Sequence, residues 1–177
     1  MIKSILLAGM GGQGILFAGK QLALAGMYSD KKVTWLPSYG AESRGGTSNC
    51  TVVISDEEIG SPVVANPDIL FVMNMPSYRK FAGTVAAGGI IIGDSSLITE
   101  KCGRGDISEH YIPATSIAYE KDMLKLANVI MLGKLIKITG VFTHDELVDS
   151  MRKTIPESKK DLLELNIKAL EIGLQHE

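Results

Sequence analysis

The chain has 177 residues, enough for one domain with its own core, and 45% of them are hydrophobic while only 6% are aromatic. A formal net charge of -2 argues against nucleic acid as the main partner, because a phosphate-binding face makes a domain basic. The two cysteines are far apart, the three histidines are scattered, and no apolar run reaches roughly 20 residues. These features argue against disulfides, a metal site and a membrane span, respectively, so we expect a cytoplasmic chain.

The first 14 residues contain the most informative pattern. The apolar run 5–8 leads directly into Gly9-Met10-Gly11-Gly12-Gln13-Gly14, and apolar residues then continue to about Ser29. A short run of Ile and Leu that breaks into glycines and resumes at helical length predicts a strand, a tight turn and a helix. The predicted helix is so apolar that other elements must cover it on more than one side.

The glycines of this turn match a nucleotide-binding pattern. Gly9, Gly11 and Gly14 satisfy G-x-G-x-x-G, in which the missing side chains permit the turn, the approach of a ligand and close packing of helix on strand. A dinucleotide site also needs an acidic residue roughly 20 positions later. The next predicted strand, 32–36, instead runs into Pro37-Ser38-Tyr39. A free-standing nucleotide-binding module therefore stays only as the alternative function.

A second pattern overlaps the first. Gly14, Gly19 and Lys20 fit the G-x-x-x-x-G-K of a phosphate loop, but Gln21 replaces the Ser or Thr that holds magnesium, and this stretch is predicted to be helical. We interpret Gly19 and Gly26 as small residues that let the helix pack closely.

The stretch 37–49 is long, small and polar. Loops of this length are uncommon in compact domains and are often functional. Because it leaves the carboxyl end of a strand, the edge where open α/β sheets bind ligands, we expect it to lie beside the glycine turn. Arg44 suits a phosphate or carboxylate, and Glu42 is either its structural partner or a polar contact to a cofactor. An internal ion pair in a surface loop is the alternative.

The remaining strands follow from short apolar runs. The run 50–54 is predicted to pair antiparallel with 32–36, because no helix separates the two. Further strands are predicted at 69–73, 90–94 and 107–112. Asp94 ends one of them and is either a site residue or an ordinary polar residue at a strand end.

Helices are predicted between and after these strands. One begins after Asn74 with Pro76 in its first turn, and others occupy the last third of the chain. The region 116–138 is predicted as one or two helices ending near Gly140, and capping boxes at 143–146 and 154–157 are predicted to start the last two. The elements together predict a three-layer, doubly wound, Rossmann-like α/β fold over residues 1–177, with a mainly parallel sheet, some antiparallel pairing and a helical C-terminal third.

The blocks 9–14 and 37–46, in this order and at this separation, resemble the gamma subunit of 2-oxoacid:ferredoxin oxidoreductases, equivalent to one domain of the single-chain pyruvate enzymes. The similarity runs over essentially the whole chain and includes 52–55 and 68–70. It implies a subunit of an enzyme that decarboxylates a 2-oxoacid oxidatively, passing electrons to ferredoxin and the acyl group to coenzyme A. No general base stands beside a nucleophile, so we assign no catalytic residue and expect no turnover by the chain alone.

The resemblance also implies partners and site residues. In that family thiamine diphosphate with Mg is held mainly by other subunits, and iron–sulfur clusters by a cysteine-rich subunit or by extensions. Alpha, beta and ferredoxin-like delta subunits are therefore the expected partners, and no cofactor is expected on this chain alone. The family's two blocks fall on ten residues, expected to line the interface with the catalytic subunits and the coenzyme A or thiamine diphosphate pocket: Gly11, Gly12, Gln13, Gly14, Ser38, Tyr39, Glu42, Arg44, Gly45 and Gly46.

Overall fold

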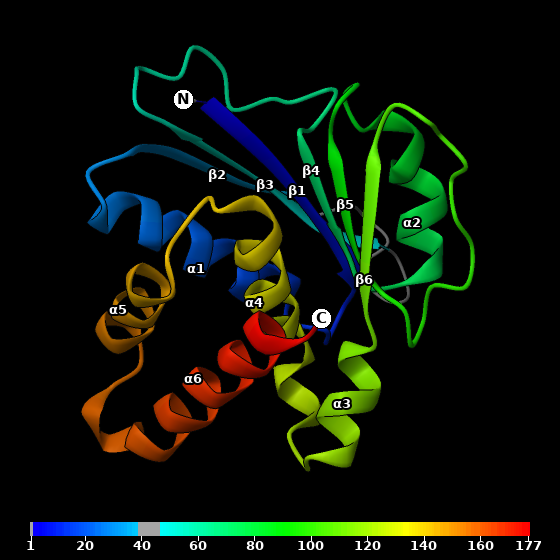
Figure 1. The fold of residues 1–177 in the computed structure, drawn as a ribbon. Helices are drawn as coiled ribbons and strands as arrows, with labels where there is room; N and C mark the ends of the chain where they lie inside the picture. The colour runs from blue at the N-terminus through cyan, green and yellow to red at the C-terminus, as the bar shows by residue number, and fades with distance from the viewer. Residues whose placement is uncertain (1, 39–46) are drawn as a thin grey trace.

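The computed structural model describes residues 2–38 and 47–177, which are built around a six-stranded sheet (Figure 1). The strands are β1 (Ile2–Met10), β2 (Lys32–Ser38), β3 (Thr47–Ser55), β4 (Ile69–Val72), β5 (Ile90–Asp94) and β6 (Ser108–Ile112). Their order is β2-β3-β1-β4-β5-β6, in which β1, β4, β5 and β6 are parallel and β3 is antiparallel to both β1 and β2. The predicted fold class, including the antiparallel pair, is confirmed.

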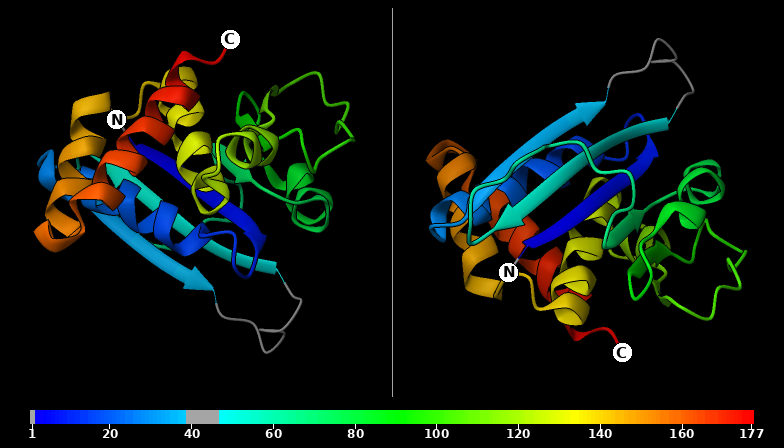
Figure 2. Two further views of the ribbon diagram at one scale, coloured as in Figure 1. Left: turned by 90° about the horizontal axis from the view of Figure 1, so that it is seen from below. Right: turned by 90° about the horizontal axis from the view of Figure 1, so that it is seen from above.

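Both faces of the sheet are covered. Alternate residues of β1 enter two separate clusters: Ile5 and Leu7 pack toward α1 (Ile15–Tyr28), while Leu6 and Ala8 pack toward α2 (Met75–Phe81). The chain moves from β1 to β2 in one direction and from β4 to β5 in the other, so crossovers of one hand place α1 and α2 on opposite faces. Figure 2 shows this arrangement from below and above. The direction in which the chain adds successive strands across the sheet therefore reverses between β1 and β4.

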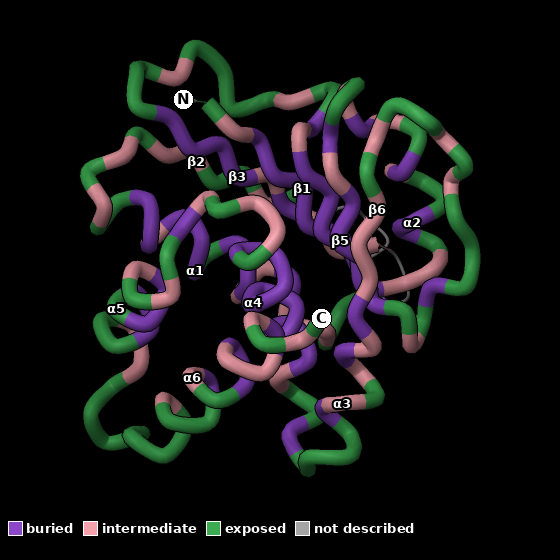
Figure 3. Tube along the Cα trace, in the orientation of Figure 1, coloured by how far each residue is buried: buried purple, intermediate pink, exposed green. Residues whose placement is uncertain are grey.

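Helices of the last third cover the α1 face. They are α3 (Ala114–Glu120), α4 (Ala127–Thr139), α5 (His144–Thr154) and α6 (Lys160–Gln175). A short 3-10 turn separates α3 from α4, and α4 ends at Gly140 with a φ of 60°, as predicted. Figure 3 shows α4 buried along almost its whole length. None of the helices in the described ranges combines the length and apolarity needed to cross a membrane.

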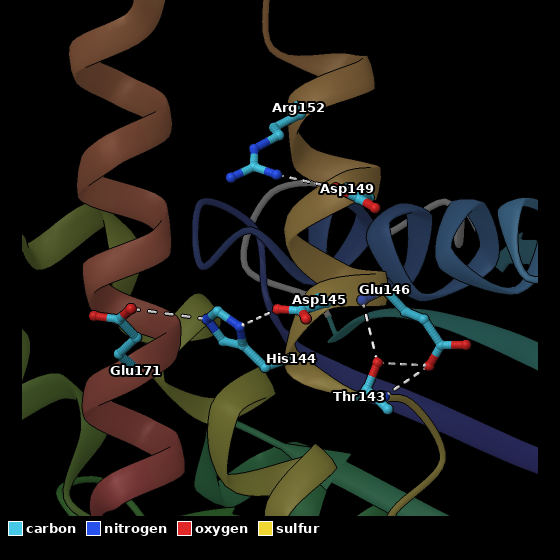
Figure 4. A network of polar contacts seen from close by, with 7 residues as sticks. All are labelled: Thr143, His144, Asp145, Glu146, Asp149, Arg152 and Glu171. Carbon is cyan, nitrogen blue, oxygen red and sulfur yellow. Dashed lines mark hydrogen bonds and ion pairs between the residues drawn. The ribbon is translucent and has the colours of Figure 1, made fainter.

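The two predicted capping boxes have different outcomes. At the start of α5 the box is confirmed: Thr143 Oγ1 accepts from the Glu146 main chain, and Glu146 Oε2 accepts from the Thr143 main chain at 2.7 Å (Figure 4). The box at 154–157 is wrong. Thr154 lies in the last turn of α5, where its hydroxyl donates to Ser150 O at 2.9 Å, and α6 begins after Lys159 without a side-chain cap. A hydroxyl bonded back within its own helix is not placed to cap the next one.

The small residues of α1 pack closely, as predicted. A Cβ on Gly19 would lie 2.4 Å from Cys50 Sγ on β3, and one on Gly26 would lie 2.6 Å from Val33 Cγ2 on β2. The other side of α1 meets α5, where the buried Gln21 accepts from Ser150 Oγ at 3.0 Å. Elements of the same chain therefore cover α1 on two sides. Residues 15–28 are helical, so they form no phosphate loop.

On the opposite face, Glu109 of β6 joins α2 to the sheet. Its carboxylate accepts from Tyr78 Oη at 2.6 Å, from Tyr111 Oη, and from Cys102 Sγ at 3.4 Å. Burial raises the pKa of Glu109, but the hydrogen bonds from Tyr111, Tyr78 and Cys102 outweigh it and hold that pKa below its usual value.

This network predicts a pH-dependent contribution to stability. Because the folded pKa of Glu109 lies below the unfolded value of roughly 4.3, its contribution is fully present above that value and is lost as the pH falls through the folded pKa. We expect Glu109→Gln to lower the free energy of unfolding by about 1–2 kcal/mol at pH 7 and by much less at an acidic pH below the folded pKa. Urea denaturation at both pH values tests this, with the exposed Glu120→Gln as control. An equal loss at both pH values would contradict it.

Candidate functional site

The glycine turn lies at the edge of the sheet that is formed by the carboxyl ends of its parallel strands. It stands between β1 and β4, where the order in which the chain adds strands reverses. β1 and β4 run parallel here, with Ala8 opposite Val72, and both strands end at this edge. Gly12 and Gly14 have φ values of 93° and 75°, in the left-handed region that side chains disfavour. Gly14 is also the N-cap of α1 and has no side-chain cap. Open α/β sheets bind ligands at such a switch point, next to the helix N-terminus.

Gln13 fixes the turn and spans the space between the two strand ends. Its Oε1 accepts from Met10 N at 2.7 Å, and its Nε2 donates to Met73 O, just beyond β4, at 2.9 Å. The Gln13 amide is therefore engaged within the chain. Gly11 and Gly12 are both exposed, and a Cβ on either would meet no atom within 4 Å. The backbone of these two glycines is what the turn presents to a ligand or a partner.

Two residues that the sequence did not indicate hold the turn from either side. Ser77 of α2 donates to Gly9 O at 3.2 Å, and Asn128 of α4 donates from Nδ2 to Gly14 O at 3.0 Å. The signal in the sequence for Asn128 is a polar residue inside an apolar helical run. Nothing local indicates its partner, since the two residues of each pair are far apart along the chain.

The described ends of the predicted loop lie at this same edge. Ser38, at the end of β2, is exposed and pairs with Asn49, while Thr47 at the start of β3 pairs with Met10 at the end of β1. Of the ten predicted site residues, the structure therefore places Gly11, Gly12, Gln13, Gly14 and Ser38 along one edge. Tyr39, Glu42, Arg44, Gly45 and Gly46 lie outside the described residues.

Asp94 has a structural role. Its buried carboxylate accepts from the Ser96 main chain at 3.0 Å and from the Thr115 main chain at 3.1 Å, and also from the Thr115 hydroxyl. These contacts join the end of β5 to the start of α3. Among residues 2–38 and 47–177, no three His, Cys, Asp or Glu side chains gather where they could hold a metal ion.

A pocket of about 210 Å³ adjoins Gly14, between α1, the start of α4 and the start of α6. Asn128 and Asn166 line it and are only 3% and 2% exposed, and each has a buried amide oxygen without a hydrogen-bond partner. An unpartnered buried acceptor costs about 1–3 kcal/mol. Small-molecule sites usually enclose roughly 300–1,000 Å³, so this pocket is closer in size to one inserted side chain.

Comparisons with known proteins agree with the resemblance found in the sequence. The family described as pyruvate ferredoxin/flavodoxin oxidoreductase matches residues 4–176. Ketoisovalerate oxidoreductase subunit VorA of Methanothermobacter thermautotrophicus is 40% identical over 174 residues, which are 97% of this chain and 35% of VorA. 2-Oxoglutarate synthase subunit KorC of Methanocaldococcus jannaschii is 37% identical over 164 residues, which are 91% of this chain and 88% of KorC.

A solved structure extends the likeness to the fold. The gamma subunit of a keto/oxoacid ferredoxin oxidoreductase from Geobacter sulfurreducens has a TM-score of 0.85 and 29% identity, covering 99% of this chain and 95% of that one. The chain thus spans about a third of VorA but nearly all of a separate gamma subunit. The chain belongs to the pyruvate ferredoxin/flavodoxin oxidoreductase family, as a chain of gamma-subunit length.

Proposed function

We propose that this chain is the gamma subunit of a 2-oxoacid:ferredoxin oxidoreductase and acts in coenzyme A-dependent oxidative decarboxylation only within the complex. The observation that carries this proposal is the family match over residues 4–176. Its partners are alpha and beta subunits and a ferredoxin-like delta subunit, with ferredoxin as electron acceptor in the cytoplasm. Thiamine diphosphate, Mg and the iron–sulfur clusters belong to those other subunits.

The glycine turn is the part of this chain that fits the proposed role. The exposed main chain of Gly11 and Gly12 stands at the N-terminus of α1, where the helix dipole and free N–H groups favour a phosphate or carboxylate. Gln13 holds the turn against β4, so this surface is preorganised. Coenzyme A, when bound, supplies the thiol that accepts the acyl group. The ten residues predicted from the sequence form the proposed interface with the catalytic subunits and the cofactor pocket.

A free-standing nucleotide-binding module is not supported. β2 ends at the exposed Ser38, where a dinucleotide site would place a carboxylate for the ribose hydroxyls. The relatives found are oxidoreductase subunits instead.

Co-purification tests the proposal. A tagged copy of the chain, expressed in its native cell, is expected to bring down the other subunits, and the eluate is expected to oxidise a 2-oxoacid with a viologen dye as acceptor. Recovery of the tagged chain alone, without viologen-linked activity, would end the proposal.

A further inference from the structure

The pocket beside Gly14 contains polar groups that its own chain leaves unpaired. Apart from Lys125, its other side chains are apolar: Phe17, Leu126, Ile155 and Leu162. Asn128 Nδ2 donates to Gly14 O at 3.0 Å, and Asn166 Nδ2 donates to Leu162 O at 2.7 Å. The two main-chain carbonyls can accept a hydrogen bond only from the side-chain amide nitrogen. These bonds therefore determine which terminal atom of each asparagine is the oxygen. The amide oxygens of these two pocket-lining residues are therefore the atoms without a partner, and each calls for a hydrogen-bond donor.

The charge and the apolar walls of the pocket indicate which kind of hydrogen-bond donor fits it. Lys125 lines it and forms no ion pair within the described ranges, so a second cation would be repelled. A neutral N–H or O–H donor is favoured, carried on a side chain that suits the apolar walls. Tryptophan and tyrosine meet these requirements and are the residues most enriched as anchors in protein interfaces.

The surroundings resemble an interface. Leu124, Leu162 and Leu165 are 55%, 42% and 44% exposed, and they lie on the segments that frame the pocket. The start of α6 has no side-chain cap, and the opposite charges of Lys160 and Asp161 in its first turn offset one another, so no capping hydrogen bond fixes this end of the helix. The two amide oxygens are closed off from solvent in the isolated chain, so a partner side chain can reach them only if the start of α6 shifts outward.

We propose that this pocket is the anchor site for another subunit of the complex. A tryptophan or tyrosine of that subunit enters between the start of α4 and the start of α6, donates to an amide oxygen of Asn128 or Asn166, and is flanked by carboxylates that face Lys125. Because Asn128 also donates a hydrogen bond to Gly14 O, the inserted side chain stabilises the position of the glycine turn through Asn128. The inference rests on the proposed function and specifies where one partner docks.

Two variants test the anchor. Leu162→Glu places a charge on the rim, and Asn166→Leu removes one acceptor. Val63→Glu is the control, since Val63 is 72% exposed on the connection between β3 and β4, at the opposite edge of the sheet. In titrations of fluorescently labelled chain with the purified remaining subunits, we expect Leu162→Glu to bind about tenfold more weakly and Asn166→Leu about threefold more weakly. Val63→Glu is expected to bind like the wild type, and all three chains to melt within a few degrees of it.

Hydrogen exchange of the assembled complex provides a second measurement. Segments 124–128 and 160–166 are expected to exchange more slowly after assembly. Wild-type affinity in both pocket variants, or unchanged exchange of these segments, would overturn the anchor while leaving the proposed function intact. Protection by coenzyme A without other subunits would also overturn it, because the occupant would then be a small molecule. If the wild-type chain binds none of the subunits, the proposed function itself fails.

Discussion

Gly14→Ala is expected to lower the free energy of unfolding by about 2–4 kcal/mol, whereas Gly11→Ala is expected to change it by less than about 0.5 kcal/mol. At a φ of 75°, an alanine at position 14 costs roughly 1–2 kcal/mol of backbone strain. Its Cβ would also lie 2.5 Å from Asn128 Nδ2 and displace the amide that donates to Gly14 O. Gly11 has no positive φ and has open space where its Cβ would be.

Urea denaturation of the two variants measures this difference. Equal losses in both would contradict the roles assigned to the two glycines. Gly11→Val separates structure from function, because its side chain would project from a surface proposed to meet a partner or a cofactor. We expect it to fold like the wild type and to lower the activity of the assembled complex at least about tenfold. Full activity with Gly11→Val would mean that nothing approaches the turn closely.

Gly173→Ala is expected to lower the free energy of unfolding by about 3 kcal/mol or more, or to prevent folding. Its Cβ would lie 1.8 Å from Ile130 O, and a Cβ on Gly133 would lie 2.1 Å from Leu170 O. These contacts are with main-chain atoms, which cannot turn aside as a flexible side chain does. Overpacking usually costs about 1–3 kcal/mol, and α4 is too enclosed to move away from α6.

Thermal denaturation tests the α4–α6 contact. For a domain of this size a loss of about 3 kcal/mol lowers Tm by roughly 6–12 °C. Gly60→Ala is the matched control, because Gly60 has open space around it and no positive φ, and we expect its Tm to stay within about 2 °C of the wild type. A Gly173→Ala chain that melts like this control would show that α4 and α6 can move apart without loss of stability.

Local patterns in the sequence predicted much of the fold. The break from Ile and Leu into glycine located β1, the turn and α1, and the lack of a helix between 32–36 and 50–54 predicted the antiparallel pair. Gly140 and the capping box at Thr143 predicted helix ends, because the chemistry that ends a helix is local.

Contacts between distant segments were beyond such patterns. Gly133 and Gly173 meet only because α4 and α6 cross at these positions, and a single sequence contains no signal for that crossing. Asn128 has its role for the same reason, since its partner belongs to the first turn of the fold. The capping box predicted at Thr154 was wrong although the sequence pattern for it is present. The Thr154 hydroxyl is already hydrogen-bonded within α5 and does not cap the next helix.

We infer that this chain completes an oxidoreductase that it cannot operate alone. The most direct test mixes purified alpha, beta and delta subunits with coenzyme A, a 2-oxoacid and a viologen dye, and adds the chain in increasing amounts. We predict that dye reduction rises until the chain equals the other subunits in number, and that the chain alone reduces none. Full dye reduction before any of the chain is added would contradict the claim.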